Sequence, residues 1–86
     1  MNMIYDIRNV GYEFMAAEEC MKKHDENGAI THYTLVIRNY EYADNEYMIN
    51  PDTPFIMNEC GHEMKFPSLS FMVRKAEEEL AKLRKK

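Results

Sequence analysis

Cysteine and glycine are both scarce in this chain of 86 residues. Only two cysteines occur, Cys20 and Cys60. Disulfide-stapled secreted domains of this length usually carry four or more, so the count favours a protein of the reducing cytoplasm. There are three glycines, and the sequence contains no glycine-rich phosphate loop, no nucleophile elbow and no HExxH zinc motif. We therefore expect a protein that is not an enzyme.

Long apolar runs are missing as well. No segment approaches the ~20 apolar residues that a helix needs to cross a bilayer. The opening stretch MNMIYDIRNVG carries Asp6 and Arg8 among its apolar residues. It lacks both the basic region and the uninterrupted apolar region of a secretory signal. The sequence therefore predicts neither a membrane span nor a secretory signal.

Basic residues are few in the body of the chain. Residues 1–65 hold 5 Lys/Arg against 12 Asp/Glu, whereas residues 66–86 hold 6 against 3. No basic residue occurs between Arg38 and Lys65, and a surface of carboxylates repels phosphate backbones. The basic cluster at residues 84–86 has no interleaved aromatic residues. Direct binding of nucleic acid is therefore disfavoured.

The apolar residues that are present suffice for one small core. The chain is 45% hydrophobic and 30% charged, which is ordinary for a globular domain. A chain of this length leaves no room for a second independent core. We expect residues 1–86 to form a single domain.

Two stretches have the apolar spacing of amphipathic helices. Between residues 3 and 24 apolar side chains recur in steps of four and three, which predicts a helix that stops at Asn27-Gly28. The alternative is a short strand followed by a helix from about residue 11, because residues 3–5 favour a strand and Gly11 weakens a helix. After Pro67-Ser68 apolar residues recur at i, i+3, i+4 and i+7, which predicts a C-terminal helix.

The middle of the chain has the pattern of strands. Residues 30–38 alternate with a period of two, which places Tyr33, Leu35 and Ile37 on one face and Val36 on the other. This pattern predicts a half-buried strand.

Two turn signals follow this predicted strand. Asp44-Asn45 lies between tyrosine-rich runs at residues 40–42 and 46–49, and both turn residues tolerate a positive φ, so a hairpin is expected there. Residues 55–57 and 64–66 flank a further turn near Cys60-Gly61 and predict a third strand or a second hairpin. The predicted fold class is α+β, with two amphipathic helices packed on one face of a small antiparallel β-sheet.

Four cysteine and histidine side chains could form a zinc site. Cys20 and His24 are four residues apart on the predicted first helix, and Cys60 and His62 are two residues apart in the later turn. Each spacing puts two ligands on one side of its element, and Cys₂His₂ is a tetrahedral zinc set. The alternative is a small buried thiol at Cys20 and an imidazole at a helix end.

Tyrosines and carboxylates are crowded together around the predicted hairpin. Tyrosine offers a large contact area, few rotatable bonds and a hydroxyl, which suits it to interfaces. The alternative is that the tyrosines only pack in strands and that the charges protect a sheet edge. The candidate partner-binding residues are Tyr40, Glu41, Tyr42, Asp44, Glu46 and Tyr47.

These features predict a protein that binds another protein. Spaced carboxylates can occupy the basic groove of a nucleic-acid-handling protein, since they are attracted there as phosphates are. A short acidic chain without a catalytic signature also resembles, in size and charge alone, the small accessory and inhibitor proteins of phages and mobile elements. We expect a small acidic inhibitor that blocks a larger host or defence protein. The alternative is a module that binds zinc or a nucleotide-like small molecule, with a homodimer as one way to build the pocket.

Overall fold

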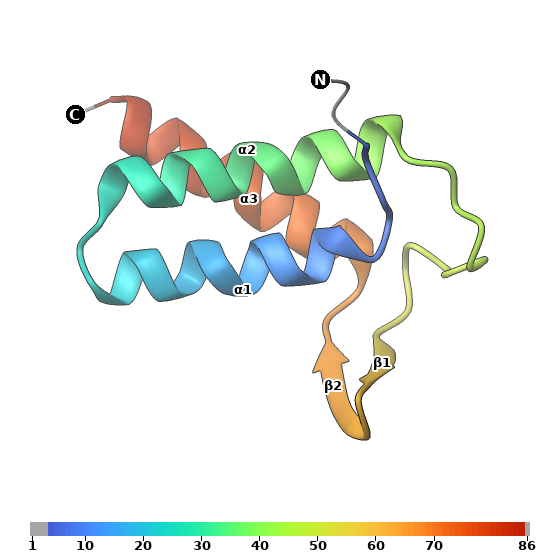
Figure 1. Cartoon of the computed structure of the whole chain (residues 1–86). Coiled ribbons are helices and arrows are strands. Elements are labelled where there is room, and N and C mark those ends of the chain that lie inside the picture. Colours follow the sequence, from blue (N-terminus) through green and yellow to red (C-terminus); the bar gives the residue numbers. More distant parts are fainter. Residues whose placement is uncertain (1–3, 86) are drawn as a thin grey trace.

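Three helices and a two-stranded antiparallel sheet make up the fold, which is an α+β arrangement (Figure 1). The computed structural model describes residues 4–85. Helices α1 and α2 run side by side in opposite directions, and α3 packs against them. The sheet is a hairpin that extends from the end of the helical layer at which α1 begins (Figure 1). The elements are α1 Asn9–Lys22, α2 Glu26–Tyr42, β1 Phe55–Glu59, β2 His62–Phe66 and α3 Leu69–Arg84.

The first helix begins between the two predicted starts. α1 begins at Asn9, whereas the expected helix began at residue 3 and the alternative began near residue 11. Met3 lies outside the described residues. The helix ends at Lys22, and His24 follows it with φ 59°. The Asp25 N–H donates to the Cys20 carbonyl at 2.8 Å and the His24 N–H to the Met21 carbonyl at 3.2 Å. This is a Schellman motif, which stops the helix before Asn27-Gly28.

Residues 30–38 form part of a helix, so the predicted strand is wrong. α2 is capped by Asp25, whose carboxylate accepts a hydrogen bond from the Gly28 N–H at 3.0 Å. Asn27-Gly28 therefore lies in the first turn of α2. The buried residues of this helix recur in steps of four and three, which gives it a face toward the core. These residues are Ala29, Tyr33, Val36 and Asn39.

The hairpin expected at Asp44-Asn45 is also wrong. Tyr40 and Tyr42 belong to the last turn of α2, and residues 43–54 form an irregular connection to β1. The strand edge that was to carry the tyrosines is therefore replaced by a helix end and a loop.

No helix in residues 4–85 is long and apolar enough to cross a membrane.

Residues 55–66 were expected to form a third strand or a second hairpin, and they form the hairpin. β1 pairs with β2 in a register that places Phe55 opposite Phe66. Cys60 and Gly61 join the strands, with φ 51° and φ 78°. Positive φ at both central residues is the conformation of a type I′ turn, whose twist matches that of paired strands.

Gly11 allows the hairpin to approach α1 closely. A Cβ atom at this position would lie 2.9 Å from the ring of Phe66. The Phe66 ring packs edge-on against Tyr12 at 5.9 Å and stacks on Phe55 at 5.4 Å. The contact explains why a residue that weakens helices is found inside α1.

The predicted C-terminal helix is confirmed as α3. Ser68 caps it, with its hydroxyl accepting a hydrogen bond from the Phe71 N–H at 3.2 Å. Its apolar face closes the core against α1 and α2. The buried residues of α3 are Leu69, Met72, Ala76, Glu79, Leu80 and Leu83.

Candidate functional site

A hollow of about 270 Å³ lies at the end of the α1–α2 pair where α2 finishes. Two segments far apart in the sequence form it, the stretch that precedes α1 and the loop that follows α2. We call it the acidic tyrosine hollow. Its lining residues are Ile4, Tyr5, Asp6, Tyr42, Asp44, Glu46 and Tyr47.

The loop wall of the hollow is shaped by Asn45. Its side chain accepts a hydrogen bond from the Ile49 N–H at 3.0 Å and donates to the Ile49 carbonyl at 2.8 Å. The Met48 N–H also donates to the Asn45 carbonyl at 3.1 Å. Met48 has φ 54°, a conformation that costs energy for a side chain other than glycine. These bonds hold the loop in a closed turn that carries Glu46 and Tyr47.

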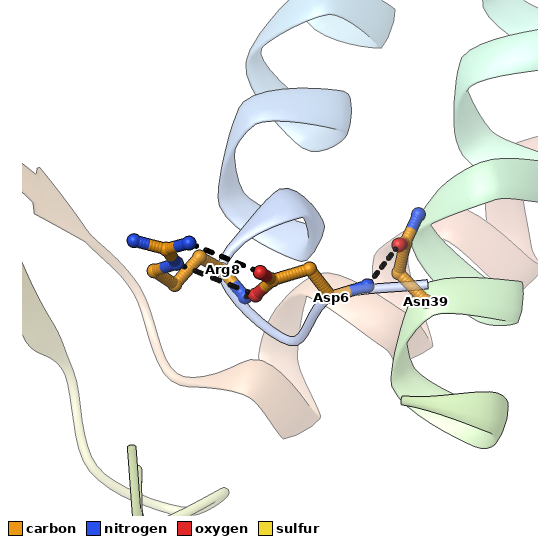
Figure 2. Close-up of polar contacts among 3 residues, drawn as sticks. All are labelled: Asp6, Arg8 and Asn39. Atoms are coloured by element: carbon orange, nitrogen blue, oxygen red, sulfur yellow. Dashed lines mark hydrogen bonds and ion pairs between the residues drawn. The ribbon is translucent and has the colours of Figure 1, made fainter. Parts of the chain in front are cut away.

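Asn39 on α2 holds the N-terminal wall of the hollow (Figure 2). Its side-chain oxygen accepts a hydrogen bond from the Asp6 N–H at 3.0 Å, and its amide nitrogen donates to the Leu35 carbonyl at 2.7 Å. Asn39 is buried, and both bonds are partly buried. Residues 4–6 are in this way fixed to the helix that also supplies Tyr42.

Asp6 is the one carboxylate of the hollow with an ion-pair partner in residues 4–85 (Figure 2). The guanidinium of Arg8 lies 3.1 Å from its carboxylate, and the Arg8 N–H donates to the same group at 2.8 Å. The side-chain hydrogen bond from Arg8 lowers the pKa of Asp6, with the backbone bond acting in the same direction against desolvation. Asp6 therefore stays ionised at neutral pH. Arg8 is placed beside the hollow and does not line it.

Aromatic rings are exposed around the hollow. Tyr42 and Tyr47 are 67% and 46% exposed, and the Tyr42 ring packs against Tyr5 with centroids 5.5 Å apart. Ile4 on the lining and Met48 beside Tyr47 are more exposed still, at 85% and 87%. Exposed apolar side chains that gather in one place indicate a binding surface more strongly than scattered ones.

Of the six candidate partner-binding residues, the structure brings four to the hollow. Tyr42, Asp44, Glu46 and Tyr47 line it. Glu41 is exposed in the last turn of α2, and Tyr40 is partly buried and packs against the core. Neither residue lines the hollow. The sequence prediction missed the N-terminal wall, residues 4–6. Nothing in the local pattern could have shown it, because the link runs through Asn39.

The candidate zinc ligands fall into two separate pairs. Cys20 lies in the last turns of α1 and His24 in the turn to α2, at the end of the helix pair away from the hairpin (Figure 1). Cys60 and His62 are exposed at the hairpin turn. Among residues 4–85, no three His, Cys, Asp or Glu side chains form a group that could hold a metal ion. The four residues are thus not brought together in the described chain, and zinc binding stays a prediction.

No known protein family, curated protein or solved structure matches the chain. The function of the hollow is therefore argued from its own geometry.

Replacing Asn39 with alanine should weaken the fold by about 1–2 kcal/mol. The change removes the acceptor of the Asp6 N–H and the link between residues 4–6 and α2. Urea unfolding followed by circular dichroism measures the loss. Asn58→Ala is the control, because Asn58 is exposed on β1 and should change stability by less than about 0.5 kcal/mol. Equal stability of the two variants would show that Asn39 does not anchor the N-terminal wall.

Proposed function

We propose that this protein is a small binding protein that attaches to a larger protein through the acidic tyrosine hollow and blocks it. The observation that carries the proposal is the convergence of two distant segments on one hollow. That hollow gathers three tyrosines and three carboxylates. Such a surface combines contact area with charge, which are the two requirements of a selective protein interface.

The exposure of two tyrosines on the hollow suits them to this role. Tyr42 and Tyr47 expose aromatic area on a helix end and on the loop that Asn45 holds, so little conformational entropy is lost when they bind. The two residues lie on one hollow and could contact a partner together.

The negative charge of the acidic tyrosine hollow favours a basic partner. Asp44 and Glu46 have no ion-pair partner in the described part of the chain. Unpaired carboxylates at this surface are attracted to the basic groove that a nucleic-acid-handling protein offers to phosphates. We therefore propose a host or defence protein of that kind as the target, and an origin in a phage or mobile element. Two free cysteines fit action in the reducing cytoplasm.

The double variant Asp44→Lys/Glu46→Lys tests the proposal. It reverses two charges on the hollow, and we expect at least tenfold less capture of the partner by the tagged protein. The captured protein is identified by mass spectrometry, and its activity is then measured with and without the purified chain. A loss of activity that needs the unmodified hollow is the expected result.

Glu77→Lys/Glu78→Lys is the matched control. Both residues are exposed on α3, away from the hollow, and the exchange alters net charge by the same amount. We expect it to leave capture and inhibition unchanged at moderate salt. If both double variants lose capture equally, net charge and not the hollow accounts for binding, and the proposal is wrong.

A further inference from the structure

The Tyr47 ring already contacts one guanidinium within the molecule. The central carbon of the Arg8 guanidinium lies 4.5 Å from the centroid of this ring. That distance is typical of a cation–π contact, in which the negative face of the ring attracts the cation. Arg8 lies outside the lining of the hollow, so the contact leaves the hollow open.

The hollow has acidic groups that this arginine does not neutralise. Arg8 pairs with Asp6, while Asp44 and Glu46 have no ion-pair partner in residues 4–85. No lysine or arginine is among the residues that line the hollow. A cation that enters it would meet two unpaired carboxylates and the rings of Tyr5, Tyr42 and Tyr47.

The size of the hollow limits what can enter. Its volume of about 270 Å³ is below the roughly 300–1,000 Å³ of pockets for drug-sized ligands. A single long side chain is a better match than a nucleotide. Its three carboxylates also repel a phosphate group.

We infer that the acidic tyrosine hollow holds an arginine side chain presented by the partner, an inference that rests on the proposed function. A guanidinium is planar, so it stacks on tyrosine rings while its N–H groups pair with carboxylates. A lysine ammonium pairs as a point charge and cannot stack in this way. Surfaces that hold nucleic acid are rich in arginine, so the inferred occupant agrees with the class of target.

Peptide titration followed by NMR tests the inference on the intact protein. The probes are capped pentapeptides of glycine with arginine, lysine or citrulline at the centre, citrulline being a neutral isostere of arginine. We expect the arginine peptide to shift the amide signals of Tyr42, Asp44, Glu46 and Tyr47 in a saturable way. The lysine peptide should bind severalfold more weakly, and the citrulline peptide should cause no shift. Equal shifts from the lysine or citrulline peptide would overturn the assignment.

Three variants at exposed positions locate the binding. Asp44→Asn/Glu46→Gln should remove the arginine-dependent shifts, whereas Glu77→Gln/Glu78→Gln should retain them. Tyr47→Leu should weaken binding of the arginine peptide by about two- to fivefold, which is the range of an exposed cation–π contact. Circular dichroism verifies that each variant is folded. Arginine-dependent shifts that survive in Asp44→Asn/Glu46→Gln would place the peptide elsewhere and overturn the inference.

The outcome separates this inference from the proposed function. If capture of the partner depends on Asp44 and Glu46 but the arginine peptide causes no shifts at the hollow, the surface binds its partner and the arginine assignment is wrong. If the peptide binds as expected but charge reversal leaves capture and inhibition intact, the hollow holds arginine and the proposed function is wrong.

Discussion

Replacing Val36 with aspartate should strongly destabilise the protein at neutral pH. Val36 is fully buried in the middle of α2, so the new carboxylate would lie in the core without a partner. A buried unpaired charge costs at least about 3 kcal/mol, against a total stability of roughly 4–13 kcal/mol for a chain of this size. We expect the melting temperature to fall by more than about 12 °C.

Thr31→Asp is the control for this experiment. It adds the same charge to the same helix at an exposed position, and it should keep the circular dichroism signal of the helices. The pair of variants also separates helix from strand. In the strand that the sequence predicted, Val36 points away from the core and an aspartate there would be tolerated. A stable Val36→Asp variant would therefore contradict the burial of this face of α2.

Strong alkali should destabilise the protein through Tyr33. Its ring is buried against Phe14, and it lines a second hollow together with Glu18 and Glu79. Burial, with smaller contributions from Glu79 and Glu18, raises the pKa of Tyr33 to about 12. An unfolded tyrosine has a pKa of about 10. Between these two pKa values, Tyr33 keeps its proton in the folded state, whereas in the unfolded chain it has already lost it.

The sign of the pH effect follows from these two values. Below pH 10 both states keep the proton, and stability does not depend on Tyr33. Between about pH 10 and pH 12 only the unfolded state loses the proton, so the free energy of unfolding falls with rising pH. A shift of two units corresponds to roughly 2–3 kcal/mol.

Tyr33→Phe should remove this alkaline loss. Urea unfolding at pH 8, 10 and 12 compares it with the unmodified chain and with Tyr42→Phe, which removes a hydroxyl from an exposed ring. We expect Tyr42→Phe to follow the unmodified chain and Tyr33→Phe to retain about 2–3 kcal/mol more of its neutral-pH stability at pH 12. If all three lose stability equally, the Tyr33 hydroxyl is not shielded from water in the folded state.

The error in residues 30–38 has a physical cause. Tyr33, Leu35 and Ile37 alternate as in a strand, yet Ala29, Tyr33 and Val36 recur as in a helix, so periodicity alone cannot choose between the two. The Thr, Val and Ile content favours a strand. The segment packs against both α1 and α3, and this packing stabilises the helix over the strand. Asp25 was the local signal available, because it is a good N-cap three residues before Gly28.

Other elements were predictable because a single local pattern specified each of them. α3 has a capping serine and one continuous apolar face. The β1–β2 turn has Gly61 at a position of positive φ. The start of α1 was not predictable from the apolar spacing, which continues back to residue 3, whereas in the structure the Asp6 N–H is bonded to Asn39 of another helix.

The candidate site was predicted in part for a similar reason. Tyr42, Asp44, Glu46 and Tyr47 are close in sequence, so any local fold keeps them near one another. Their true context, a helix end facing residues 4–6, is a long-range property.

The short turn between α1 and α2 bears on how the chain folds. Residues 23–25 join two helices that pack side by side, and closing so small a loop costs little entropy. α3 follows α2 only after residues 43–68. Contacts near in sequence form faster than distant ones, so we expect the α1–α2 pair to assemble first and α3 to dock later. The acidic tyrosine hollow adjoins the end of that early pair at which α1 begins and α2 finishes, so its walls can come together before the core is closed.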